Sequence, residues 1–170
     1  MKPLNISKAK FALANLGNKK IVVSGGSSKT VVDGCGNTRT AYSESVHAYD
    51  IDCDRWELLP CLNIARSSHS STVLAACKQV YVFGGYAEGK HLDSIEVLHF
   101  GEDAWQPIKV EAFTARGSAI IAAISEREII ILGGQFRDIE HDGQWHYLSD
   151  VVIFDAKERI AWRVNANTGL

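Results

Sequence analysis

Three copies of a short apolar run that ends in two glycines limit the possible folds more than any other feature. The glycine pairs are Gly25-Gly26, Gly84-Gly85 and Gly133-Gly134, and the runs before them are rich in Ile, Val and aromatic residues. Such runs are typical of buried strands, and a glycine pair marks a sharp exit from a strand. A unit that recurs about every fifty residues predicts a repeat protein.

Each copy contains more than the run before its glycines. A small-residue run precedes it, and an alternating run and a tryptophan follow it, so that each unit contains four short strands and needs no helix. The first runs are 11–16, 69–75 and 117–124. The third runs are 45–49, 94–98 and 150–154, and the tryptophans are Trp56, Trp105 and Trp162.

The glycine pairs, the Tyr49-Asp50 dipeptide and Trp56, seven residues after Tyr49, resemble kelch repeats over nearly the whole chain. The resemblance implies an all-β fold, in which one kelch-repeat domain spans 1–170. It would contain three four-stranded blades of a β-propeller, at about 4–60, 61–110 and 111–164.

The resemblance also implies that the first strand of each unit lines a central channel. It implies that the tryptophan and the aromatic residue before it pack between neighbouring blades. The sequence departs from the pattern twice: Leu98 stands where Tyr49 would recur, and Trp162 follows Phe154 by eight residues. We expect these departures to affect packing detail and not the fold.

Three blades are fewer than the four to eight that close most propellers. An open end would expose an apolar blade face, which predicts an association surface. We therefore expect a partial propeller. Self-association or a partner fragment could complete it, to about six blades, and the chain could also be part of a longer protein. A self-sufficient fan of three blades is the alternative.

The composition of the chain excludes some classes of partner and location. The formal net charge of -2 argues against a nucleic-acid or anionic-membrane surface, and no apolar run is long enough to span a bilayer. The first residues lack the apolar core of a signal peptide, and the four cysteines form no Cys-x-x-Cys pair. We expect a cytoplasmic protein with reduced thiols and no cofactor.

Candidate binding residues recur at equivalent positions. Two of the three sets precede the first strand: Lys8, Arg66 and Arg116, and two residues later Lys10, Ser68 and Ser118. The third set, Tyr86 and Gln135, directly follows a glycine pair. In kelch propellers these loops share a face around the channel mouth, so the resemblance implies one site. The donors would suit an acidic peptide or a carboxylate. A structural ion pair or a solvated turn is the other interpretation.

One cluster could hold a metal ion. Asp138, Asp142 and His146 in the loop 135–148 resemble the Glu-x-x-x-Asp-x-x-x-His iron motif of kelch-type nitrile-specifier proteins, with Asp138 in place of the first Glu. The alternative is a solvated acidic loop. The sequence favours a protein–protein interaction module or scaffold that is not an enzyme, and a metal-dependent enzyme using this loop is the second hypothesis.

Overall fold

The computed structural model describes residues 3, 8–31, 38–111, 113–138 and 143–164, and every regular element in these ranges is a β-strand. The predicted all-β class is confirmed. Within the described residues, no helix is long and apolar enough to cross a membrane.

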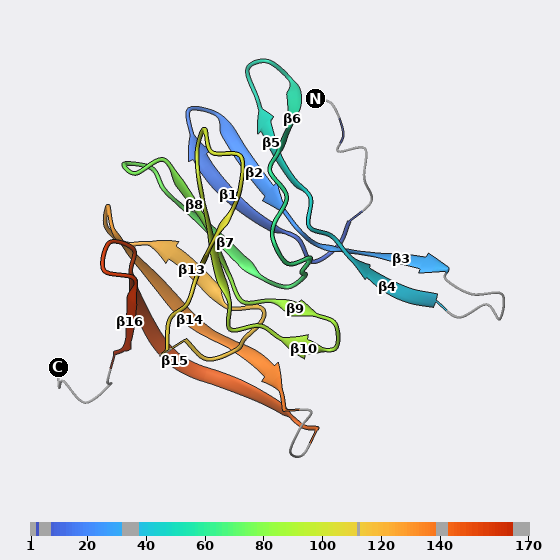
Figure 1. Ribbon diagram of the computed structural model, residues 1–170, viewed down its shortest axis with the longest axis vertical. Coiled ribbons are helices and arrows are strands. Elements are labelled where there is room, and N and C mark those ends of the chain that lie inside the picture. Colours follow the sequence, from blue (N-terminus) through green and yellow to red (C-terminus); the bar gives the residue numbers. More distant parts are fainter. Residues whose placement is uncertain (1–2, 4–7, 32–37, 112, 139–142, 165–170) are drawn as a thin grey trace.

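Three four-stranded antiparallel sheets follow one another along the chain (Figure 1). The first contains β1 (Ala12–Gly17), β2 (Lys20–Ser24), β5 (Val46–Asp50) and β6 (Arg55–Leu59). The second contains β7 (Ser70–Leu74), β8 (Gln79–Phe83), β11 (Ile95–His99) and β12 (Gln106–Ile108). The third contains β13 (Ile120–Ala123), β14 (Glu128–Arg137), β15 (Trp145–Asp155) and β16 (Ile160–Arg163).

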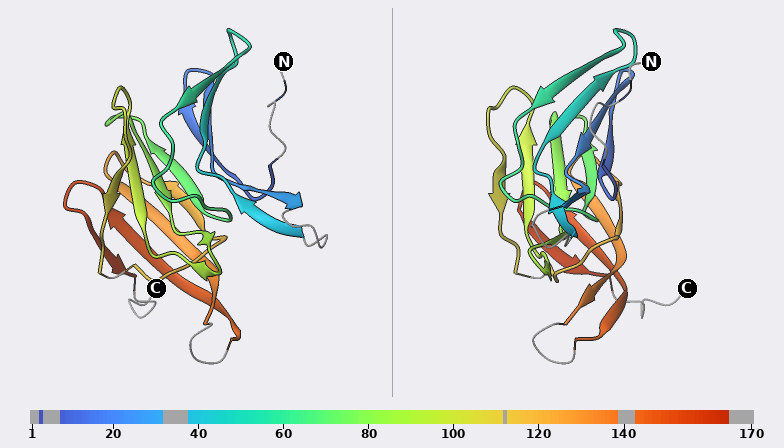
Figure 2. Two further views of the ribbon diagram at one scale, coloured as in Figure 1. Left: turned by 45° about the vertical axis from the view of Figure 1, so that its right-hand side comes forward. Right: turned by 90° about the vertical axis from the view of Figure 1, so that its right-hand side faces the viewer.

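The sheets are arranged as blades of a partial propeller. Strand β7 contacts both β1 and β13, so the first strands of the three sheets lie side by side at the inner edge. The sheets stack face to face in chain order, and they form no closed ring (Figure 2). The prediction of three blades in a partial propeller is therefore confirmed.

Three β-ribbons extend from the same end of the blades (Figure 1). The first pairs β3 (Ser27–Val31) with β4 (Thr38–Tyr42), and the second pairs β9 (Tyr86–Ala87) with β10 (Lys90–His91). The third is the far part of β14 and β15, from Gly134–Leu148 to Arg137–Trp145. Each ribbon follows a glycine pair, where the sequence predicted loops.

Two apolar cores hold the blades together, one at each interface. Between the first two sheets lie Val22, Val46, Val82, Leu98 and Trp105, with four smaller or flanking residues. The second core lies between the second and third sheets. Its members include Tyr81, Phe83, Ile95, Ile131 and Phe154. Burial of such side chains stabilises each interface by about 25 cal/mol per Å² of apolar surface.

The glycine pairs adopt the same backbone conformation in all three copies. In the second pair φ is +59° at Gly84 and +106° at Gly85, a region that side chains rarely enter. A Cβ on Gly84 would lie 2.2 Å from the carbonyl oxygen of Arg116. The pair therefore allows the loop of the next blade to cross directly over the end of the strand.

The tryptophans do not all lie between blades. Tyr49 pairs with Trp56 across β5 and β6, with ring centroids 4.7 Å apart, and Trp105 is buried between the first two sheets. In the third sheet Phe154 pairs with Ala161, and Ile153 pairs with Trp162. A shift of one residue moves a side chain to the other face of a sheet. The eight-residue spacing therefore places Trp162 on the face that points away from the second sheet, contrary to the expected packing.

Candidate functional site

Three residues in a left-handed conformation form the rim of the inner channel. Lys10, Ser68 and Ser118 have φ values of 56°, 53° and 57°, and each lies two residues before the first strand of its blade. The Ser68 N–H donates to the Lys10 carbonyl at 2.8 Å, and the Ser118 N–H donates to the Ser68 carbonyl at 2.7 Å. Main-chain hydrogen bonds therefore line up equivalent residues of successive blades.

A pocket of about 250 Å³ lies at this rim, between the inner strands and the three ribbons. It gathers Lys10, Ser68 and Ser118 with Tyr86 and Gln135, five of the eight residues that the sequence predicted for binding. Seven further residues complete the lining: Ser27, Thr40, Tyr42, Ser67, His91, Arg137 and Trp145. The predicted loops thus do share one face.

An aromatic row crosses this pocket from ribbon to ribbon. The ring centroids of Tyr42 and Tyr86 are 6.0 Å apart, those of Tyr86 and His91 5.0 Å, and those of His91 and Trp145 5.5 Å. All three contacts are edge-to-face, a favourable geometry for aromatic pairs. Each ribbon contributes at least one ring, so the row is a feature of the assembled blades.

Burial shapes the protonation of the row. Burial raises the pKa of the Tyr42 hydroxyl, with a smaller contribution from Tyr86, and burial lowers the pKa of His91. The backbone N–H of Arg137 donates to His91 Nδ1 at 3.1 Å. Because Nδ1 accepts this hydrogen bond, the imidazole is neutral and carries its proton on Nε2.

Charge at the pocket is positive. Lys10 and Arg137 are cationic lining residues, and none of the described lining residues is Asp or Glu. This is notable in a chain whose formal net charge is -2. Hydroxyls of Ser27, Ser67, Ser68 and Ser118 add neutral donors. The pocket therefore offers cations, hydroxyls and aromatic faces to a ligand, and it repels cations.

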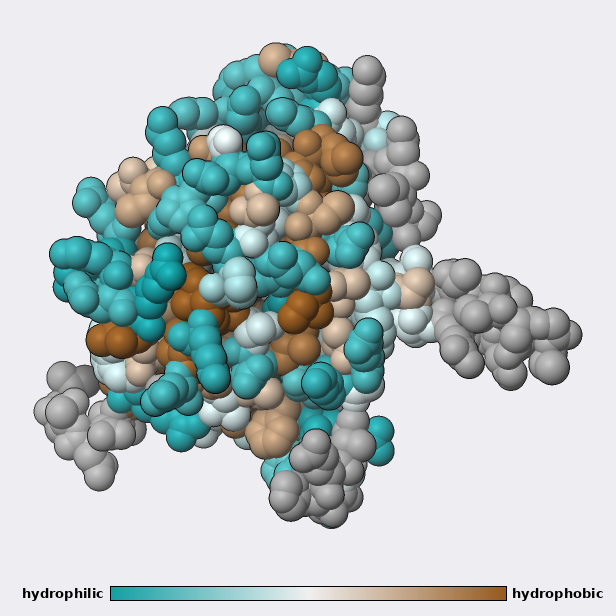
Figure 3. All heavy atoms as spheres, in the orientation of Figure 1, coloured by the Kyte–Doolittle hydropathy of each residue, from teal (hydrophilic) through white to brown (hydrophobic). Residues whose placement is uncertain are grey.

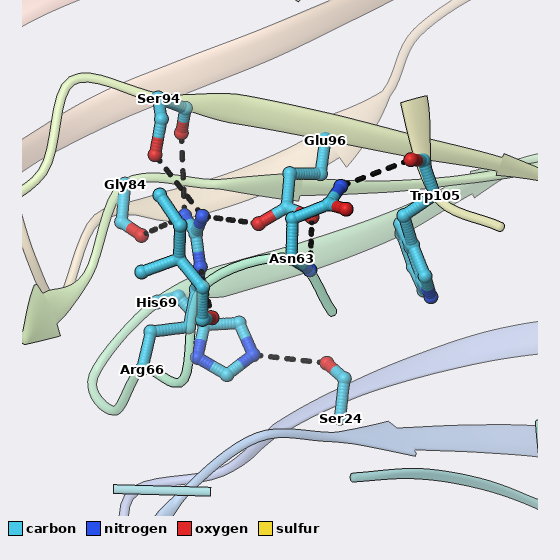
Figure 4. A network of polar contacts seen from close by, with 9 residues as sticks. Ser24, Asn63, Arg66, His69, Gly84, Ser94, Glu96 and Trp105 are labelled. Atoms are coloured by element: carbon cyan, nitrogen blue, oxygen red, sulfur yellow. Dashed lines mark hydrogen bonds and ion pairs between the residues drawn. The ribbon is translucent and has the colours of Figure 1, made fainter. Parts of the chain in front are cut away.

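Arg66 and Arg116 lie inside the protein and not at the pocket. The Arg66 guanidinium donates to the Gly84 carbonyl at 2.7 Å and to Ser94 Oγ at 3.0 Å, and it forms an ion pair with Glu96 (Figure 4). Arg116 donates to the Gly133 carbonyl at 2.9 Å and binds both carboxylate oxygens of Asp150 at 2.8 and 2.9 Å. Both arginines therefore form structural ion pairs, which was the alternative interpretation of this position.

Asn63 belongs to the same interior network, and His69 is buried beside it. Asn63 donates twice to Glu96 Oε2, through its backbone N–H and its side-chain amide, both at 2.8 Å. Nearby, Ser24 Oγ lies 2.9 Å from His69 Nε2 (Figure 4). Burial lowers the pKa of His69 to about 3, assisted by the positive charge of Arg66. His69 is therefore neutral, as expected for a core histidine.

Lys8 occupies the position of Arg66 and Arg116 in the first blade. Its ammonium contacts Ser45, which corresponds to Ser94 in the second blade. Burial lowers the pKa of Lys8. The set therefore ties the start of each blade to the equivalent position of its third chain run, at Ser45, Ser94 and Asp150. It holds the loop beside the pocket in place.

The predicted metal residues lie on the third ribbon. Asp138 and His146 are described, and the His146 ring stacks on Phe136 with centroids 4.9 Å apart, whereas Asp142 lies outside the described residues. Among the described residues there is no group of three or more His, Cys, Asp or Glu side chains that could hold a metal ion.

Of the seven lining residues that the sequence did not single out, four carry aromatic or cationic side chains, namely Tyr42, His91, Arg137 and Trp145. Each stands on a ribbon whose pairing the sequence did not reveal. Their aromatic or cationic character inside otherwise polar inserts is the signal that could have singled them out.

The three stacked four-stranded sheets, with their glycine pairs and loop-lined channel mouth, define a β-propeller repeat protein. The chain belongs to the kelch-repeat family, since residues 10–169 match the family described as the KLHDC2/KLHL20/DRC7 Kelch-repeats domain. It is also 33% identical over 73 residues to an F-box/kelch-repeat protein of Arabidopsis thaliana. The matched segment covers 43% of this chain and 19% of that protein.

Proposed function

We propose that this chain is a protein-interaction module that binds an acidic segment of a partner protein at the rim pocket. Kelch-repeat domains generally mediate protein interactions, and the F-box/kelch-repeat relative shares the repeat. The proposed contact residues are Lys10, Ser68, Tyr86, Ser118 and Gln135, joined by Tyr42, His91, Arg137 and Trp145. We propose a cytoplasmic setting, without a catalytic role.

The observation that carries the proposal is the charge of the pocket lining. Lys10 and Arg137 face a ligand with no described lining carboxylate to neutralise them. Cations beside a hollow attract carboxylates, and charge-assisted hydrogen bonds to carboxylates are about twice as strong as neutral ones. The aromatic row from Tyr42 to Trp145 supplies apolar contact area beside the charges.

Rigid support is the second argument. The buried Arg66 and Arg116 hold the loops that lead into Ser68 and Ser118, and the αL residues are hydrogen-bonded from blade to blade. A binding surface that is ordered before the ligand arrives loses less entropy on binding. Loops on a rigid β-frame are common binding sites.

An array of ten-residue peptides rich in Asp and Glu, printed beside the same peptides with Asn and Gln, tests the proposal. The chain should bind acidic members selectively, and binding should weaken as salt is added. Lys10→Glu and Arg137→Glu should each abolish binding. Lys19→Glu is the control, because Lys19 is exposed and pairs with Asp52 away from the pocket. Equal binding to both peptide sets, or loss only with Lys19→Glu, would refute the proposal.

A further inference from the structure

The two end faces of the blade stack are apolar and open. The outer face of the third sheet, defined as the side turned away from the second sheet, contains Ile120, Leu132, Ile160 and Trp162. Register places these residues on one side with Ile130 and Ile153. Ile120 is 70% exposed and Trp162 is 40% exposed. Hydrophobic side chains are visible at the surface over β13 and β16, at the left of Figure 3.

The other open side is the outer face of the first sheet, turned away from the second sheet. Its cross-strand rows contain Leu13, Val23 and Leu58, and then Ile21 and Trp56. Leu13 is 51% exposed and Leu58 is 68% exposed. Hydrophobic patches of this kind on both ends of one molecule mark association surfaces.

The interfaces inside the chain show what covers such faces. The side of the second sheet that corresponds to the open face of the first contains Val80, Val82, Leu98 and Trp105, and the first sheet covers it. The opposite side, with Tyr81, Phe83, Ile95 and Val97, is covered by the third sheet. Each open end is thus the counterpart of a face that another blade buries elsewhere in the same chain.

Main-chain groups at the two ends match in the same way. The Gly26 N–H donates to the Arg66 carbonyl, and the Gly85 N–H donates to the Arg116 carbonyl, both at 2.8 Å. Gly134 occupies the donor position of the third blade, and Lys8 occupies the acceptor position of the first. Ser118 and Lys10 are likewise the end members of the αL row. The third blade therefore ends where the first blade begins in this bonding pattern.

We propose that the outer face of the third sheet docks on the outer face of the first sheet of a second copy, with Trp162 as the anchor. The arrangement is head-to-tail, like the contacts between blades within the chain. Such interfaces close when the rotation permits. Two copies give six blades, within the usual four to eight, whereas three copies exceed that range. The closed pair would bring two rim pockets to one channel mouth.

Trp162 distinguishes this face from the buried ones. The corresponding residue of the outer strand is polar in the first two blades. It is Glu57, which pairs with Ala48, in the first blade and Gln106, which pairs with Val97, in the second. The third blade has Trp162 opposite Ile153. Tryptophan is enriched among the residues that dominate binding energy at interfaces, so its substitution should disrupt the pair most.

Light scattering of the 170-residue chain across a concentration series tests the proposal. The expected mass is twice 18.7 kDa at high concentration. Trp162→Glu and Leu13→Glu should each give monomers, while Tyr147→Glu, on the exposed third ribbon, should leave the pair intact. Ile120→Glu on the same face guards against a folding defect in Trp162→Glu, and circular dichroism confirms that each variant is folded.

Mixing the two monomeric variants gives the sharper result. Trp162→Glu retains a working first-sheet face and Leu13→Glu retains a working third-sheet face, so the mixture should form a one-to-one pair. A wild-type chain that stays at 18.7 kDa at every concentration would overturn the proposal. So would a paired Leu13→Glu beside a monomeric Trp162→Glu, since that result means third sheet against third sheet.

Discussion

The guanidinium of Arg66 and the carboxylate of Glu96 form an ion pair in which both side chains are almost completely buried, at 0% and 1% exposure. The pair connects the loop that enters the second blade to the third strand of that blade. Asn63 also depends on Glu96, since both of its nitrogen donors bind the second carboxylate oxygen.

Removing Glu96 should therefore be costly. Glu96→Ala leaves the Arg66 charge buried without its carboxylate and removes the acceptor of Asn63, so we expect the free energy of unfolding to fall by about 3–5 kcal/mol. Urea denaturation followed by circular dichroism measures it. Asp52→Ala is the matched control, because its ion pair with Lys19 is solvent-exposed and should contribute little. Equal effects of both substitutions would contradict the buried network.

His69 should make the protein sensitive to mild acid. Its pKa falls from 6.5 in the unfolded chain to about 3 in the folded one. A lowered histidine pKa means that the unfolded state binds more protons below pH 6.5, so stability decreases as the pH falls from 6.5 towards 3. Between pH 6.5 and 5, the titration of His69 should lower the free energy of unfolding by about 2 kcal/mol.

The comparison is with His69→Gln, which cannot titrate. Its free energy of unfolding should decrease less over the same interval, so the difference between the two proteins should shrink by about 2 kcal/mol. Urea denaturation at pH 6.5, 5.75 and 5 gives both curves. Parallel curves would mean that His69 is not buried as described.

Gly84 and Gly89 allow a matched test of the strand-end geometry. At Gly84, φ is +59° and a Cβ would lie 2.2 Å from the Arg116 carbonyl oxygen, whereas at Gly89, φ is +87° and nothing lies within 4 Å. Gly89→Ala should cost only the left-handed backbone penalty, about 1–2 kcal/mol. Gly84→Ala must also displace the loop of the next blade, so its free energy of unfolding should fall further, by about 3 kcal/mol or more. Thermal denaturation ranks the two, and a reversed order would contradict the close approach.

The tryptophans should differ in what they contribute to stability. Trp105 is buried between blades and donates its indole N–H to the Pro60 carbonyl at 2.8 Å. Trp105→Ala should therefore cost about 3–5 kcal/mol. Trp162→Ala should cost clearly less in dilute, monomeric protein, because its indole is on the open side of the third sheet. Chemical denaturation at low concentration checks both, and equal losses would place Trp162 in the core.

The sequence predicted the strands and the blades well because the repeat is local. The glycine pairs and the run from Lys20 to Ser24 fix where β2 ends, and the same pattern recurs twice. The sequence also contained the signal for the sheet face on which Trp162 lies. Its eight-residue spacing from Phe154 was visible, but only the observed pairing of Phe154 with Ala161 shows that the extra residue shifts the register.

The site was less predictable because it depends on contacts between distant segments. The shared loops pointed to Lys10, Ser68 and Ser118, which the structure places in one pocket. The burial of Arg66 could not be read from its repetition, since its partner Glu96 lies in the distant strand β11, and the equivalent residue of the first blade, His47, is not a carboxylate. Likewise, the row from Tyr42 to Trp145 appears only when three ribbons of different length meet.

The αL row at the channel mouth is fastened through peptide groups alone, from the Lys10 carbonyl to the Ser68 N–H and onward to Ser118. Lysine and serine already occupy the same conformation there, and the bonds do not depend on which side chain is present. These positions can therefore exchange one chemical group for another while the scaffold stays intact.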